Sequence, residues 1–120
     1  MNPFEPGVCG AQGLHAVMTK HQARKGSRTI SGREYRYFYN PMWGLFGDRT
    51  SGPAGTYYLS SAKPVNYFWN IYDQVLVRPE LMDGIVDIRL LEYDGKVSLR
   101  TPDGVPRVSD HLPIYLELEL

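Results

Sequence analysis

Alternation of apolar and polar residues is clearest at the carboxy-terminal end of the chain. Residues 114–120 (IYLELEL) place isoleucine or leucine at every second position, which predicts a strand with one buried face. Residues 69–77 (WNIYDQVLV) alternate in the same way and predict another strand, with Asp73 on its apolar side. Branched residues predict a strand over 85–91, and Asp94-Gly95 predicts a hairpin turn into a short strand over 97–99.

Glycine and proline divide the rest of the chain into short elements. Apolar residues spaced by three or four between Glu5 and His21 predict helix, broken near Gly10 and Gly13 into two short pieces. Residues 21–32 have no apolar period and several cations, which predicts an exposed basic loop. The other expected elements are strands over 35–39 and 56–59, short helices over 42–46 and from Pro79 to near Gly84, loops over 47–55 and 101–107, and a turn over 60–64.

Composition places these elements in one small globular domain. The chain has 120 residues, of which 42% are hydrophobic and 22% charged, so we expect a single domain over residues 1–120 with a packed core. Short helices beside a mixed, largely antiparallel sheet predict the α+β class. Thirteen basic residues balance thirteen acidic ones, so no net charge attracts the chain to nucleic acid or anionic lipid, and any polyanion site must be local.

Cysteine usage and the length of apolar runs bear on the compartment. Cys9 is the only cysteine and cannot form an internal disulfide, and no charged-then-apolar leader precedes it. We therefore expect a cytoplasmic protein. The apolar runs fall far below the ~20 residues that span a bilayer, so we expect no membrane partner.

An acid and an imidazole stand side by side at Asp110 and His111, directly before the last predicted strand. Neighbouring side chains in an extended segment point to opposite sides, so each needs its own partner. Asp73 is a candidate partner for His111, because a carboxylate on the apolar side of a strand is unfavourable unless it is paired. Such a pair would fix the imidazole for stabilising a phosphoryl oxygen or moving a proton. From the residues alone, a turn-capping aspartate and a histidine packed at a strand end are the commoner explanation.

Four sequence blocks favour the functional explanation over the structural one. They are YNPMW (39–43), GTYY (55–58), WNIYDQVLVRPEL (69–81) and SDHLPIYLEL (109–118). In this order they resemble the carboxy-terminal half of the endonuclease/exonuclease/phosphatase superfamily, which includes deoxyribonuclease I and the exonuclease III type of abasic-site endonuclease. The resemblance runs from about Pro3 to Leu120. It implies about half of a four-layer α/β sandwich, in which two facing sheets are covered by helices.

The resemblance also implies roles for particular residues. His111 matches the catalytic histidine that contacts the scissile phosphate, and Asp73 matches the aspartate that orients it. Asp110 matches a catalytic aspartate close to the divalent metal, Mg²⁺ or Mn²⁺, and is the expected metal ligand in this chain. Beside these blocks, Trp69, Asn70 and Trp43 are expected to line a substrate cleft, although aromatic core packing is an equally good explanation for the tryptophans.

Several residues that the family requires are not found in this sequence. The amino-terminal asparagine, the metal-binding glutamate and the Asp-x-Asn motif have no match, and the resemblance places Asp-x-Asn just upstream of Met1. We therefore expect a carboxy-terminal fragment of a metal-dependent phosphodiesterase or phosphatase that is incomplete for catalysis alone. The alternative is a folded, non-catalytic remnant that acts as an oligomeric binding module. An unrelated small α+β protein with accidental matches is a third explanation.

Partners and substrate follow from the same resemblance. Half of a sandwich would leave an apolar sheet face uncovered, so we expect a homo-oligomer, most simply a dimer, or association with a missing amino-terminal half. The substrate would be nucleic acid or another phosphoester. The choice among DNA, RNA, an inositol phosphate and a lipid headgroup stays open.

Overall fold

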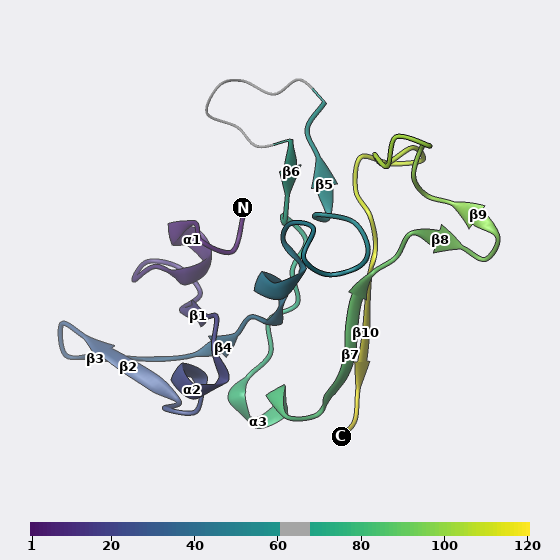
Figure 1. Ribbon diagram of the computed structural model, residues 1–120. Helices are drawn as coiled ribbons and strands as arrows, with labels where there is room; N and C mark the ends of the chain where they lie inside the picture. Colours follow the sequence, from purple (N-terminus) through teal and green to yellow (C-terminus); the bar gives the residue numbers. More distant parts are fainter. Residues whose placement is uncertain (61–67) are drawn as a thin grey trace.

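The chain forms a series of short helices and two-stranded ladders. The computed structural model describes residues 1–60 and 68–120, and Figure 1 traces them from the amino-terminal to the carboxy-terminal end. The elements are α1 (Pro6–Cys9), β1 (Ala16–Val17), α2 (Lys20–Ala23), β2 (Ser27–Ile30), β3 (Arg33–Arg36), β4 (Phe38–Tyr39), the 3₁₀ helix η1 (Pro41–Leu45), β5 (Tyr57–Tyr58), β6 (Trp69–Asn70), α3 (Pro79–Met82), β7 (Ile85–Leu90), β8 (Tyr93–Asp94), β9 (Val97–Ser98) and β10 (Ile114–Leu118). The β1–β4 ladder is parallel, whereas β2–β3, β5–β6, β7–β10 and β8–β9 are antiparallel. The predicted mixed α+β class is therefore confirmed.

Each helix begins at a proline, at a capping side chain, or at both. Proline opens α1, η1 and α3, at a position where its missing N–H group has no intrahelical partner to lose. The Asn40 side chain accepts a hydrogen bond from the Met42 N–H at the start of η1. None of the helices in the described ranges is long and apolar enough to cross a membrane.

The helix expected between Glu5 and His21 is largely absent. Helix α1 stops at Cys9, and the second predicted piece is replaced by strand β1 followed by the single turn α2. Two features explain the break. A side chain at Gly13 would meet the Gly7 and Pro6 carbonyl oxygens at 2.4 Å, and His15 has a left-handed φ of 55°. Gly13 therefore allows a close crossing of two chain segments that no continuous helix could make.

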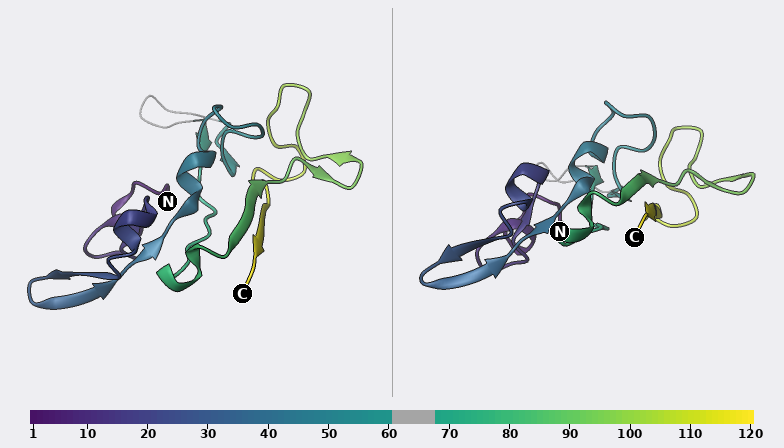
Figure 2. Two further views of the ribbon diagram at one scale, coloured as in Figure 1. Left: turned by 60° about the horizontal axis from the view of Figure 1, so that its bottom comes forward. Right: turned by 90° about the horizontal axis from the view of Figure 1, so that it is seen from below.

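The basic segment expected to be a loop over 21–32 is instead the end of α2 and strand β2. Strands β2 and β3 form an antiparallel hairpin in which Ile30 pairs with Arg33. The two residues between them, Ser31 and Gly32, have φ values of 51° and 77°. Two consecutive positive φ angles match the two-residue turn that tight hairpins favour, so Ser31-Gly32 is the turn signal that the sequence reading missed. Figure 2 shows this hairpin at one end of the molecule and β8–β9 at the other.

The strand predicted over 69–77 is mostly wrong. Only β6 pairs as a strand, and Val77 rejoins the structure through an isolated bridge to Tyr39. Between them, side chains take the backbone donors. The Ile71 N–H donates to the Asn2 side chain at 2.7 Å, and the Asp73 N–H donates to the Thr56 hydroxyl at 3.1 Å. These local acceptors replace the partner strand that the alternating pattern implied.

The carboxy-terminal strands agree best with the sequence. Strand β10 pairs with β7, with Ile114 opposite Leu90, and the register shifts between Glu117 and Leu118. The turn predicted at Asp94-Gly95 is present, with Gly95 at a φ of 60°, but its hairpin joins β9 to the short strand β8 and not to the strand predicted over 85–91, which pairs with β10 instead. The turn predicted over 60–64 lies outside the described residues from 61 onward.

Two small apolar clusters hold the elements together. One contains Ala23, Val77 and Met82, and joins α2, α3 and β4. The other contains Met42, Ile71 and Leu90, which come from η1, the segment after β6, and β7. Ile71 is fully buried two residues before Asp73. The second cluster therefore anchors the segment that carries this carboxylate.

Candidate functional site

Asp73 and His111 meet in the folded chain although 38 positions separate them. The Asp73 Oδ2 atom lies 2.6 Å from the His111 Nδ1 atom, within the range of a short charge-assisted hydrogen bond. Asp73 comes from the irregular segment after β6, and His111 from the extended segment just before β10. The contact expected between these two side chains is therefore present.

Strand β5 fixes the segment that carries His111. Tyr57 and His111 form an isolated antiparallel bridge. On either side of it, the Tyr58 N–H donates to the Asp110 carbonyl at 3.0 Å and the Leu112 N–H donates to the Thr56 carbonyl at 2.7 Å. Leu112 is 2% exposed, so the residue after the histidine is anchored in the interior. These contacts hold the histidine backbone against the sheet.

Aromatic rings support the imidazole from the side. The Tyr57 ring centroid lies 4.7 Å from that of His111, and the two planes are tilted by 57°. Tyr57 also stacks on Tyr72, with centroids 5.0 Å apart. Tyr72 precedes Asp73, so one tyrosine ring packs between the segments that supply the acid and the imidazole. Such packing limits the rotation of the His111 ring.

The other ring nitrogen of His111, Nε2, is on the side of the ring away from Asp73. With Nδ1 on the carboxylate, the neutral imidazole carries its proton on Nδ1 and presents Nε2 as an acceptor. The His111 Nε2 atom and the Asp110 Oδ1 atom are 4.0 Å apart, which is too long for a hydrogen bond. The His111 side chain is 46% exposed, so solvent and ligands reach it. Nε2 is therefore the atom of the pair that can contact a substrate.

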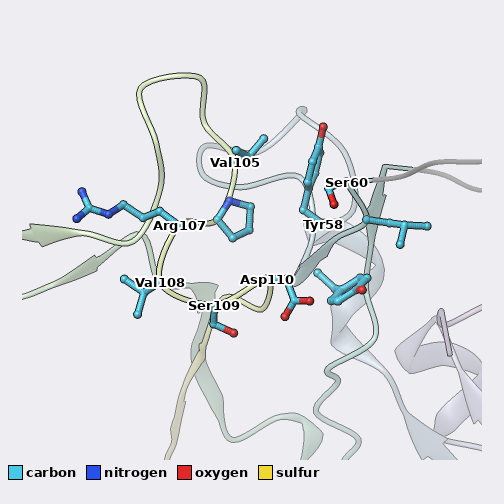
Figure 3. Close-up of a pocket in the computed structure, with 10 residues that line it drawn as sticks. Tyr58, Ser60, Val105, Arg107, Val108, Ser109 and Asp110 are labelled. Atoms are coloured by element: carbon cyan, nitrogen blue, oxygen red, sulfur yellow. The ribbon is translucent and has the colours of Figure 1, made fainter.

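Two hollows flank the short segment that carries Asp110 and His111. A cavity of about 470 Å³ lies on the Asp110 side, and Figure 3 shows Tyr58, Val105 and Asp110 around it, with the Arg107 side chain extending away. A second hollow of about 340 Å³ is lined by Asp73, Ser109, His111, Leu112, Pro113 and Ile114. Asp110 lines only the first of these cavities and His111 only the second. This division agrees with the expectation that adjacent side chains in an extended segment seek different surroundings.

The other predicted substrate contacts are placed differently. Asn70 is 3% exposed, and its side-chain oxygen accepts a hydrogen bond from the Asn2 amide at 2.9 Å. Trp69 packs edge-on against Tyr58. Trp43 lies 6.5 Å from Phe4, centroid to centroid, and lines an apolar cavity of about 350 Å³ that shares no residue with the hollows beside His111. The structure thus brings Trp69 near the first cavity but gives Asn70 a buried structural contact and Trp43 a separate surface.

The described residues do not form a complete cation site. No group of three or more histidine, cysteine or acidic side chains lies close enough together within residues 1–60 and 68–120 to hold a metal ion. Asp110, the expected ligand, is 63% exposed, and Asp73 is engaged by His111. Mg²⁺ needs a near-octahedral set of oxygens, of which this region supplies the single carboxylate of Asp110.

A separate acidic group has a pKa that neighbouring cations lower. The Asp83 carboxylate accepts hydrogen bonds from Lys20 and Arg24 at 3.4 and 2.9 Å. These bonds, with the Lys20 bond the larger cause, lower the pKa of Asp83 below its ordinary value of 3.8. The Asp83 side chain is 65% exposed at the end of α3, so this cluster ties α2 to α3 rather than building a site.

Thr56 and Asn2 are the supporting residues that the sequence did not reveal. Both are buried and both accept hydrogen bonds from the backbone between Ile71 and Asp73. Thr56 belongs to the GTYY block but carries no charge or ring that would mark it as part of a site.

Comparisons of the chain with known protein families, with curated proteins and with solved structures find no match. The superfamily resemblance therefore rests on the four sequence blocks.

Proposed function

We propose that this chain carries the histidine–aspartate part of a metal-dependent phosphodiesterase or phosphatase site of the endonuclease/exonuclease/phosphatase type. The observation that supports this function is the 2.6 Å contact between Asp73 and His111. It joins two residues from separate blocks in the arrangement that the resemblance implies. An isolated structural histidine would not require a carboxylate from a distant segment.

The pair would act on the phosphoryl group through Nε2. Asp73 holds the Nδ1–H orientation, so the opposite nitrogen faces the approaching ligand. A doubly protonated imidazole donates from Nε2 to a non-bridging phosphate oxygen and stabilises the negative charge that develops there. Asp110, 4.0 Å from Nε2, would weaken the binding of a phosphate oxyanion through like-charge repulsion, and a cation between the two groups would relieve that repulsion.

The remaining ligands for Mg²⁺ or Mn²⁺ would come from a partner chain. A cation bound there would neutralise the phosphate charge. The described residues alone supply one carboxylate and one paired imidazole, so the chain by itself would bind phosphate and show at best trace hydrolysis.

Phosphate binding tests the function directly. We expect inorganic phosphate to shift the backbone amide signals of residues 109–112 in two-dimensional NMR spectra, and His111→Ala to abolish those shifts. His21→Ala is the matched control, because His21 is an exposed histidine in α2 and its loss leaves phosphate binding unchanged. Shifts that persist in His111→Ala, or that are absent in the wild type, contradict the proposal.

Hydrolysis tests the claim of incompleteness. With Mg²⁺ or Mn²⁺ and bis(p-nitrophenyl) phosphate, we expect turnover at the level of the buffer control. Robust turnover that His111→Ala abolishes would show that the chain is a complete enzyme.

An oligomeric binding module is the second candidate function, and the surface area of the chain favours it. The accessible surface is 7818 Å², whereas a compact monomer of 13.7 kDa exposes about 6,600 Å². The excess of about 1,200 Å² exceeds the ~800 Å² that each partner buries in a standard interface. The radius of gyration, 15.9 Å, also exceeds the ~14 Å expected for 120 residues.

We propose that a second copy of the chain covers part of this excess area. Strands β7 and β10 pair only with each other in the described part of the chain, so their outer edges are available for a further strand. Sedimentation at micromolar concentration should give a dimer. A monomer at all concentrations up to about ten times higher would contradict self-association.

A further inference from the structure

Thr56 lies between the two segments that meet at the candidate site. It is fully buried, at 0% exposure, and directly precedes β5. Strand β5 is short but central: one edge pairs with β6, and the other edge bridges to His111. The residues that carry Asp73 and His111 therefore lie on opposite edges of the same two-residue strand.

Thr56 makes hydrogen bonds to both of these segments. Its hydroxyl oxygen accepts from the Tyr72 N–H at 3.0 Å and from the Asp73 N–H at 3.1 Å. Its backbone carbonyl accepts from the Leu112 N–H at 2.7 Å. One buried residue thus fixes the backbone of the acid and the backbone next to the imidazole.

The preceding glycine makes this close approach possible. A Cβ atom at Gly55 would lie 2.5 Å from the Asn70 carbonyl oxygen, so any side chain there would push β5 away from β6. The Thr56 N–H donates to the same carbonyl at 2.9 Å. The Gly55-Thr56 pair therefore sets the distance between β5 and the segment that leads to Asp73.

We propose that Thr56 is a positioning residue for the Asp73–His111 pair. Its hydroxyl oxygen accepts the backbone hydrogen bonds of residues 72 and 73 that a partner strand would otherwise accept. It thereby sets the position of the Asp73 carboxylate relative to the His111 Nδ1 atom. The use of the pair in binding phosphate rests on the proposed function, whereas the positioning itself rests on these hydrogen bonds.

The role belongs to the hydroxyl oxygen and not to the volume of the side chain. Valine has nearly the shape of threonine but no acceptor, so Thr56→Val would leave two buried N–H groups without a partner. The segment would then shift to find other acceptors and carry Asp73 away from His111. Serine keeps the oxygen and loses only a methyl group.

The test follows the tautomer of His111 together with phosphate affinity. At about pH 9, where histidines are ordinarily neutral, ring-nitrogen NMR spectra of the wild type should show the Nδ1–H form. Thr56→Val should lose this preference and bind inorganic phosphate about tenfold more weakly, the lower end of the effect of losing an outer hydrogen-bonding partner. Thr56→Ser should keep the tautomer and stay within about twofold of the wild-type affinity. Thr29→Val, at an exposed strand position, is the matched control and should change neither.

Hydrogen exchange on the wild type keeps the test independent of whether the valine variant folds. The Tyr72 and Asp73 amides should exchange far more slowly than those of exposed loops. The inference is wrong if these amides exchange freely, if Thr56→Val keeps the Nδ1–H form, or if Thr56→Ser loses it. Absence of phosphate binding in the wild type, with the Nδ1–H form intact, would overturn the proposed function and leave the positioning role supported.

Discussion

Replacing Asp73 by asparagine separates a functional pair from a structural one. The substitution keeps the shape of the side chain and removes its charge, so the His111 Nδ1–H loses its charged acceptor and can at most pair with an uncharged amide oxygen. The two side chains are 43% and 46% exposed, so the solvent screens much of the interaction. Exposed pairs of this kind contribute about 0–1 kcal/mol to folding.

The effect of Asp73→Asn on phosphate binding should be larger than its effect on folding stability. A charge-assisted hydrogen bond contributes about 1.5–3 kcal/mol when protected, and near-half exposure reduces it to roughly 1 kcal/mol. This corresponds to phosphate affinity about fivefold weaker in Asp73→Asn. The free energy of unfolding should fall by less than about 1 kcal/mol.

Two assays on Asp73→Asn and the wild type distinguish a functional pair from a structural one. NMR titration with inorganic phosphate gives the affinity, and urea unfolding gives the stability. Asp103→Asn, in the exposed loop between β9 and β10, is the control and should alter neither. A loss of more than about 2 kcal/mol of stability with unchanged phosphate affinity would refute the reasoning, because the pair would then be a structural contact.

Three further predictions concern the scaffold. Asn2→Ala removes the acceptor of the buried Ile71 N–H and should lower the free energy of unfolding by about 1–3 kcal/mol in urea. Met42→Ala empties a fully buried position in the second apolar cluster and should lower it by about 2–5 kcal/mol in the same assay. Asp83→Asn should be slightly less stable than the wild type at neutral pH. Because folding lowers the pKa of Asp83, this difference should be constant above pH 3.8 and vanish as the pH falls through the lowered value, which thermal unfolding across that range would measure.

The carboxy-terminal elements were predictable because their signals are local. Alternating leucines mark β10, branched residues mark β7, and Asp94-Gly95 supplies the positive φ of a tight turn. Pro79 likewise marks the start of α3. In each case the residues that set the element lie within it.

The elements that sequence reasoning missed depend on distant partners. The pattern of residues 69–77 alternates like a strand, but Asn2 and Thr56 take its backbone donors, and neither is near it in sequence. The Ser31-Gly32 turn carries a weaker signal than Asn-Gly, so the sequence predicts a loop where strand β2 and the turn into β3 form.

The candidate site likewise combines residues that the sequence predicts with placements that it does not predict. The residues alone make Asp73 a candidate partner for His111, and the four sequence blocks favour the pair over a purely structural role; the contact between the two side chains is present. The buried position of Asn70 and the separate surface of Trp43 depend on tertiary packing that residue type does not reveal.

The central claim is that Asp73 holds His111 with Nε2 facing a phosphoryl group. Its most direct test is a ring-nitrogen NMR titration of the wild-type protein with dimethyl phosphate, which carries the diester group without a base or sugar. The account predicts that the neutral imidazole carries its proton on Nδ1, and that at a pH where Nε2 is also protonated the His111 Nε2 signal shows a saturable shift on addition of dimethyl phosphate. An Nε2–H imidazole whose signals do not respond to the phosphodiester would contradict it.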